Sequence, residues 1–168
     1  MNREELRALQ APLKEKYREH PEAAIVTLKA TGKISDGVSC TVETGHALVK
    51  AGLHPASGGD GSLLCSGDML LEALVACAGV TMSAVATSLN VNLKNVIITA
   101  EGELDFRGTL GVTKDAPVGF KNIRLNFSID ANESDERMAS LIKLSERYCV
   151  IFQTLVKGVP VNVTSGKI

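Results

Sequence analysis

The sequence of 168 residues contains no tryptophan, two tyrosines and four phenylalanines, so aromatic residues make up only 4% of the chain. Proteins that bind single-stranded nucleic acid stack bases on aromatic side chains, and this composition nearly excludes such a platform. Neither sign of charge is in excess, because 18 basic and 19 acidic residues give a net charge of −1. The concentrated positive surface of a nucleic-acid-binding protein is therefore not expected.

The sequence also begins without the apolar stretch of a secretory signal, since four of the residues in Met1–Arg7 are charged. We therefore expect a cytoplasmic protein, in which thiols are normally reduced. With 45% hydrophobic and 22% charged residues, the composition is that of a folded globular protein. The length fits one domain over residues 23–168, preceded by a polar helix within residues 1–22.

One stretch lacks charge altogether: the 17 residues Ala73–Leu89, inside the longer segment Ser66–Leu89. Ser66 and Asp68 suit the first turn of a helix, because a hydroxyl caps free N–H groups and a carboxylate favours the positive end of the helix dipole. A helix that is apolar all round lies in the centre of a protein or in a bilayer. The run is short and contains hydroxyl groups, so we predict a buried central helix rather than a membrane span.

Alternating apolar residues predict strands over Val91–Phe106 and Phe120–Asp130, and β-rich runs precede the central helix over residues 23–34 and 38–44. Ser134 is expected to begin a second helix that continues through Ser145 and beyond. A last strand is predicted at Val161–Thr164. Strands, helix, strands, helix and strand in this order indicate an α+β fold without regular βαβ alternation.

The four cysteines are Cys40, Cys65, Cys77 and Cys149. Cys77 and Cys149 fall on the two predicted helices, where each is either a small core hydrophobe or one member of a nucleophile and resolving-thiol pair. Cys65 precedes the central helix, whose dipole would favour a thiolate, so it is an alternative partner for Cys77. Cys40 alternates with valines in a predicted strand, which favours a core position.

His54 offers another class of site, because it could join Cys65 and Cys77 around a metal ion. The three spacings match no compact metal signature, and the sequence contains no CxxC pair. A loop-ordering role for His54 is the alternative. The glycine-rich run 57–62 lacks the lysine of a phosphate-binding loop, so we expect a flexible lip over the central helix.

Three blocks of the sequence occur in a characteristic order: Cys65–Cys77, with the sequence CSGDMLLEALVAC, Gly102–Gly108, with the sequence GELDFRG, and Glu146–Cys149, with the sequence ERYC. These blocks, in this order, resemble the OsmC/Ohr family of osmotically induced and organic-hydroperoxide-resistance proteins. The resemblance covers about residues 25–164. It implies an α+β fold with antiparallel sheets around a buried central helix, in which two chains intertwine as a homodimer.

The resemblance also implies an activity, the thiol-dependent reduction of organic hydroperoxides. Cys77 would be the peroxidatic cysteine and Cys149 the resolving one, and external thiols or dihydrolipoyl groups would regenerate the dithiol. Neither a metal ion nor an organic cofactor is implied. The runner-up is a non-peroxidatic relative, a dimer that binds a small hydrophobic ligand and uses Cys77 for packing.

Family enzymes hold the thiolate with an arginine paired to a glutamate ten residues before the nucleophile. Gly67 stands at that position here, and Asp68 is the next residue. The arginine comes from an early strand in those enzymes, whereas residues 25–60 of this chain contain no arginine. The resemblance therefore leaves Asp68 and Arg107 as the candidates for the acidic and basic partners of Cys77.

Overall fold

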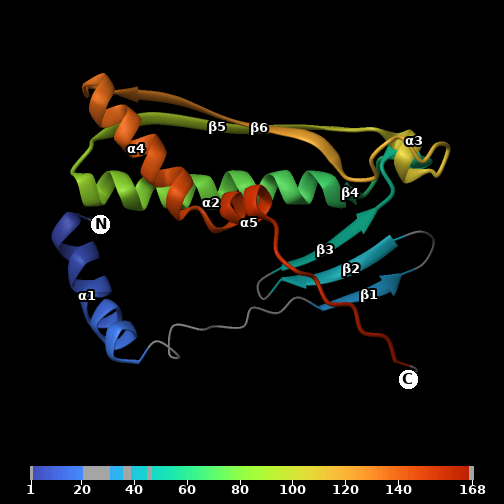
Figure 1. Ribbon diagram of the computed structural model, residues 1–168, viewed down its shortest axis with the longest axis horizontal. Helices are drawn as coiled ribbons and strands as arrows, with labels where there is room; N and C mark the ends of the chain where they lie inside the picture. Colours follow the sequence, from blue (N-terminus) through green and yellow to red (C-terminus); the bar gives the residue numbers. More distant parts are fainter. Residues whose placement is uncertain (1, 21–30, 36–38, 45–46, 167–168) are drawn as a thin grey trace.

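The computed structural model describes residues 2–20, 31–35, 39–44 and 47–166 (Figure 1). The first described helix is α1, over Arg3–Glu19, within the predicted helix at residues 2–20. Helices and strands then occur in mixed order, so the α+β prediction is confirmed. The strand predicted around residues 25–28 lies outside the described residues.

The central helix is α2, over Ser66–Leu89, as the uncharged run predicted. Its N-cap is Cys65, which makes no side-chain capping bond, so the expectation that Ser66 caps the helix is wrong by one residue. Asn90 ends the helix in the left-handed conformation, with φ of 55°, and donates its N–H to the carbonyls of Ala86 and Thr87. Asparagine is one of the few residues that adopt this conformation readily, which explains the stop.

Two long antiparallel strands cover one side of α2. They are β5, over Leu93–Leu104, and β6, over Phe120–Ala131, and Ile98 pairs with Phe127 near their middle. Inward residues alternate with exposed ones along both strands, as the period-two pattern predicted. Figure 1 shows this ribbon running alongside α2. The short helix α3, over Phe106–Thr109, lies between the two strands in sequence.

A separate four-stranded sheet precedes α2. Its strands are adjacent in chain order: β1 over Thr31–Ser35, β2 over Ser39–Thr44, β3 over Ala47–Gly52 and β4 over Leu64–Cys65. The pairing of β3 with β4 is parallel, so the expectation of purely antiparallel sheets is wrong at this edge. The residues between them include a 3-10 turn over Pro55–Ser57, and this connection is long enough to reverse the chain direction twice.

The second predicted helix is broken in two. Ser134 caps α4, over Asp135–Tyr148, by accepting the N–H of Arg137, and α5 follows over Val150–Lys157. Cys149 is both the last cap of α4 and the first cap of α5, and its φ of −73° and ψ of 109° are extended rather than helical. Both helices pack against α2.

The strand predicted at Val161–Thr164 is absent from the chain as described, since no ladder forms beyond α5. The side chains of Val161 and Val163 are 80% and 89% exposed. A lone extended segment has no neighbour to accept its hydrogen bonds, so alternating valines alone do not make a strand.

The core lies between α2, the β5–β6 ribbon, α4 and α5, and it contains two clusters of buried residues. Only one face of α2 is buried in it, through Leu74, Ala78, Met82, Val85 and Ala86. The opposite face is open, and Val80 is 73% exposed. The prediction of a helix buried all round therefore does not hold within one chain.

By length and composition alone, α2 could also cross a membrane, because an 18-residue window within it has a mean hydropathy of 1.9. Such a window is also found in core helices of globular proteins. In this chain α2 packs against β5, α4 and α5, and 28% of the window is buried.

Candidate active site

Cys77 and Cys149 lie side by side in the core. Cys149 is 1% exposed and forms a buried cluster with Leu74 and Ala78, against which the partly buried Cys77 packs. Cys77 comes from the middle of α2, and Cys149 comes from the junction of α4 and α5. Both cysteines are free thiols in this structure. The fold thus brings into contact two residues whose proximity could not be predicted from their spacing in the sequence.

The break at Cys149 places the start of α5 against the Cys77 thiol. The first N–H groups of any helix have no partner within it, and those of Val150 and Ile151 begin α5. Burial raises the pKa of Cys77, but the N–H of Ile151, the thiol of Cys149, the hydroxyl of Thr81 and the N–H of Val150 together lower it more. The pKa of Cys77 is therefore below its ordinary value.

The pKa of Cys149 moves in the opposite direction. Burial is the largest cause and raises the pKa of Cys149, and the hydrogen bond to Cys77 and the repulsion from the Cys77 thiolate raise it further. The N–H of Phe152 lowers it, but by less than burial raises it. A neighbouring thiolate accepts a hydrogen bond from a thiol, which favours one proton shared by the pair. Cys77 is the member that ionises first, and Cys149 retains the proton.

Thr81 is a contributor that the sequence reasoning missed as a functional residue. It follows Cys77 by four residues on α2, and side chains at this spacing are neighbours on a helix surface. Its hydroxyl donates to the Cys77 sulfur and lowers the pKa of that thiol. The spacing of four residues from Cys77 on a predicted helix is the signal that could have revealed it.

The two candidate ionic partners of Cys77 lie elsewhere. Asp68 is exposed and precedes Cys77 by nine residues, which is about 13.5 Å along a helix and half a rotation around it. Arg107 is 66% exposed and forms an ion pair with Asp105, with an Nη2 to Oδ2 distance of 2.5 Å and an Nε to Oδ1 distance of 2.9 Å. Neither residue is among the groups that shift the pKa of Cys77.

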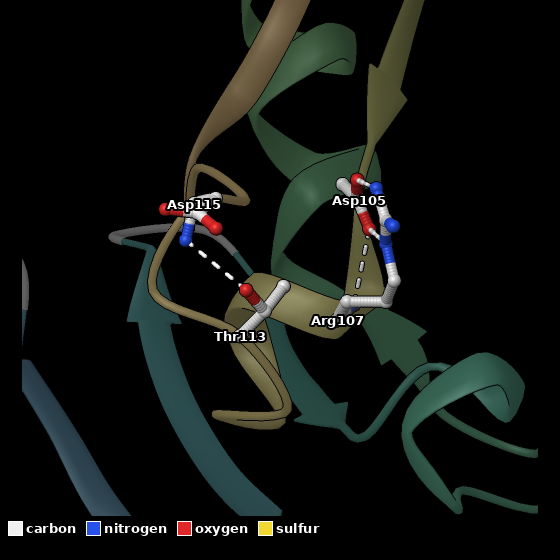
Figure 2. A network of polar contacts seen from close by, with 4 residues as sticks. All are labelled: Asp105, Arg107, Thr113 and Asp115. Atoms are coloured by element: carbon white, nitrogen blue, oxygen red, sulfur yellow. Dashed lines mark hydrogen bonds and ion pairs between the residues drawn. The ribbon is translucent and has the colours of Figure 1, made fainter.

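Figure 2 shows the Arg107 side chain folded back onto Asp105, beside the loop in which the Asp115 N–H donates to Thr113. The Arg107 guanidinium lowers the pKa of Asp105 to about 2. Asp105 also caps α3 by accepting the N–H of Arg107. Within one chain the Asp105–Arg107 pair orders the connection between β5 and β6. The roles predicted for Asp68 and Arg107 as ionic partners of Cys77 stay predictions.

A third thiol, Cys65, lines a separate cavity of about 360 Å³ together with His54. The His54 ring stacks on Phe106 with centroids 4.9 Å apart, and its Nδ1 accepts the N–H of Ala56 at 3.0 Å. His54 therefore orders its own turn, as its alternative interpretation held. Among the residues whose placement is described, no three His, Cys, Asp or Glu side chains gather as metal ligands. Cys40 lies on β2, and its side chain is outside the described part.

A larger cavity, of about 720 Å³, shares lining residues with the cluster around the cysteine pair, although neither cysteine lines it. Five of its lining residues also belong to the cluster around Cys77 and Cys149: Leu74, Ile123, Leu125, Phe127 and Phe152. The helix α5 supplies another wall through Leu155 and Val156. This volume lies within the range of about 300–1,000 Å³ typical of small-molecule sites. The side chains that pack around the thiols thus also line an apolar space large enough for an organic ligand.

Several solved structures have the same fold as this chain, and their descriptions name a protein family. An OsmC-like protein from Mycoplasma pneumoniae is 17% identical, with a TM-score of 0.67 over 79% of this chain and 89% of that chain. An organic hydroperoxide resistance protein from Elizabethkingia anophelis is 14% identical, with a TM-score of 0.63 over 80% and 91%. One from Legionella pneumophila, described as an organic hydroperoxide resistance protein OsmC, is 22% identical, with a TM-score of 0.60 over 80% and 92%.

At these identities the structural likeness shows the fold. A comparison of the sequence with curated proteins found no match. A family model of OsmC-like proteins matches residues 59–164, which is more than half of the chain and includes Cys65, Cys77 and Cys149. The resemblance that the three sequence blocks indicated is confirmed. The chain belongs to the family of OsmC-like proteins.

Proposed function

We propose that this protein is a thiol-dependent peroxidase that reduces organic hydroperoxides, with Cys77 as the attacking thiol and Cys149 as the resolving thiol. The observation that carries the proposal is the contact between two free cysteines whose pKa values are shifted in opposite directions. A peroxidatic cysteine must be a thiolate, while its partner can stay protonated until the second step. Relatives named organic hydroperoxide resistance proteins share the fold.

In the first step the Cys77 thiolate attacks the terminal oxygen of the hydroperoxide. The S–O bond forms and the O–O bond breaks, and the alkoxide takes a proton from solvent and leaves as the alcohol. Cys77 is then a sulfenic acid. In the second step the Cys149 sulfur, having lost its proton, attacks Cys77 and hydroxide leaves, which takes up a proton to become water. The product is a Cys77–Cys149 disulfide.

An external dithiol then reduces this disulfide by two exchange reactions and is itself oxidised to a disulfide. A dihydrolipoyl group, or a pair of small thiols, supplies the two electrons. A cytoplasmic location would keep such reductants available. No other cofactor enters the cycle.

We further propose that the chain acts as a homodimer. The open face of α2 carries Val80, Ala73 and Ala76, which a second α2 could cover closely because their side chains are small. The tail valines Val161 and Val163 are exposed in a segment that has no strand partner among the described residues. Intertwining of two chains would cover both surfaces, and it would offer a route by which Asp68 or Arg107 of one chain approaches Cys77 of the other.

The experiment is a reaction of the reduced protein with one equivalent of cumene hydroperoxide, followed by disulfide mapping by mass spectrometry. Rapid formation of a Cys77–Cys149 bond is expected. In Cys149→Ser a dimedone-reactive sulfenic acid at Cys77 should accumulate instead, and Cys65→Ser is the matched control that should behave as the wild type. Full turnover by Cys77→Ser would contradict the proposal, and a Cys65–Cys77 bond would replace Cys149 as the resolving residue.

The second candidate function is the binding of a small hydrophobic ligand without peroxidase chemistry. It is favoured by the apolar cavity of about 720 Å³ and by the distance of Asp68 and Arg107 from Cys77 within the chain. Under this alternative, stoichiometric hydroperoxide would leave both thiols titratable, whereas an apolar dye would still bind.

A further inference from the structure

The cavity beside the cysteine pair carries a single formal charge. Its lining is apolar except for Asn122 and Glu146, and neither lysine nor arginine contributes to it. Leu74, at 1% exposure, forms part of its floor, whereas Glu146 is exposed and therefore lies toward its solvent side. Glu146 is therefore the lining residue at which a bound ligand would meet a formal charge.

The nearest cations in sequence do not neutralise Glu146 inside the cavity. Lys143 lies one turn before it on α4 and Lys157 ends α5, and both are exposed and outside the lining. The other ions of α4 point to other partners, because Arg137 pairs with Glu133 and Arg147 lies over the Tyr148 ring. On β6, Lys121 and Arg124 flank Asn122 but lie outside the lining, and Arg124 pairs with Glu101 and Glu103, so Glu146 is the one formal charge among the described residues of the lining.

We infer that Glu146 makes this cavity selective for uncharged apolar ligands and excludes ligands of the same chain length that end in a carboxylate. An alkyl or aryl group would fill the space between α5 and β6, where Phe120, Ile123, Leu125 and Phe152 line the walls. Charge complementarity sets the choice, since an anionic head group would meet the Glu146 carboxylate without a counter-ion. As an assignment of substrate class, the inference rests on the proposed function, and it predicts neutral rather than fatty-acid hydroperoxides.

The size of the effect follows from Coulomb's law. Two like charges about 4 Å apart repel each other by about 1 kcal/mol in water, which is a factor of about five, and by more where solvent is partly excluded. Because Glu146 is exposed, the lower figure is the appropriate one. Removal of its charge should therefore improve binding of a carboxylate ligand at least about fivefold and leave a neutral ligand unchanged.

The test measures competition with Nile red, an uncharged apolar dye. Decanol and decanoate, below their aggregation concentrations, displace the dye from wild type, Glu146→Gln and Glu146→Lys. The wild type should prefer decanol. The ratio of the two inhibition constants should fall about fivefold in Glu146→Gln and further in Glu146→Lys.

Glu136→Gln removes the same charge from an exposed position of the same helix and should leave the ratio unchanged. Val156→Trp narrows the cavity from a side chain that is 59% exposed, so the fold should tolerate it, and dye binding should weaken. An unchanged ratio in Glu146→Gln, absence of dye binding, or undiminished dye binding in Val156→Trp would each overturn the inference. Absence of hydroperoxide turnover with a normal dye result would overturn the proposed function alone.

Discussion

Replacement of Thr81 by valine tests how the Cys77 thiolate is stabilised. Valine has nearly the shape of threonine but cannot donate a hydrogen bond, and Thr81 is only partly buried, so the fold should persist. The hydroxyl contributes to the lowered pKa of Cys77. Its removal should raise the pKa of that thiol, while Thr81→Ser, which keeps the hydroxyl, should restore it.

The size of the change in pKa follows from the free energy of one hydrogen bond to a charged group, which is about 1.5–3 kcal/mol. The lower value corresponds to about a tenfold decrease in the thiolate population of Cys77 well below its pKa. Thiolates of higher pKa are more nucleophilic, and the logarithm of their rate constant rises by about 0.4–0.5 per pKa unit. A tenfold smaller thiolate population is therefore partly offset by a roughly threefold higher reactivity of each thiolate. At a pH where Cys77 is only partly ionised, Thr81→Val should therefore react about threefold more slowly. Where both proteins are fully ionised, it should react about threefold faster.

The assay is iodoacetamide alkylation followed across pH, with the Cys77 peptide quantified by mass spectrometry so that the other cysteines do not contribute. The rate profiles of wild type and Thr81→Val should cross. Profiles that coincide, or a Thr81→Ser profile that follows the valine variant, would refute the assignment of the hydroxyl as a donor to the thiolate.

Three further predictions concern stability and assembly. Asp105 has a folded pKa of about 2, so its pairing with Arg107 stabilises the protein above the unfolded pKa, and this stabilisation is lost as pH falls through 2. The melting temperatures of wild type and Arg107→Ala should differ at pH 6 and converge below pH 2. Leu141→Ala should cost about 2–5 kcal/mol in urea unfolding at fixed protein concentration, because Leu141 is 0% exposed. Leu110→Ala, at a 57% exposed side chain, should change it by no more than about 0.5 kcal/mol. Val80→Asp should shift the mass measured by light scattering from dimer to monomer, and a variant that remains a dimer would place the interface elsewhere.

Much of the fold could be predicted from local patterns. The charge-free run predicted α2, and alternation predicted β5 and β6, because these elements bury a periodic face against a single neighbour. The tail valines show the limit of the same reasoning. An alternating pattern specifies which face is apolar, but a strand exists only where another strand accepts its hydrogen bonds, and no strand of the described part of the chain pairs with residues 161–164.

The site was only partly predictable, for a comparable reason. Residue type and family resemblance pointed to Cys77 and Cys149, and the fold brings these two together. The ionic partners inferred by analogy, Asp68 and Arg107, are not brought to the thiol within the chain. Periodicity also predicted one continuous second helix, because Cys149 has the correct spacing to share its buried face. The break is a tertiary feature that the apolar pattern does not encode.

That break explains how the pKa of Cys77 can be lowered although no arginine is among the described groups that shift it. In a continuous helix the N–H groups of Val150 and Ile151 would be bound to carbonyls one turn earlier, whereas at the start of α5 they are free to bind the thiolate. The groups that lower the pKa of Cys77 are all neutral hydrogen-bond donors. Salt screens interactions between separated charges but does not screen direct hydrogen bonds in a partly buried site. The reactivity of Cys77 should therefore change little with ionic strength, and a steep loss of alkylation rate in high salt would mean that a cation, supplied by a second chain, holds the thiolate after all.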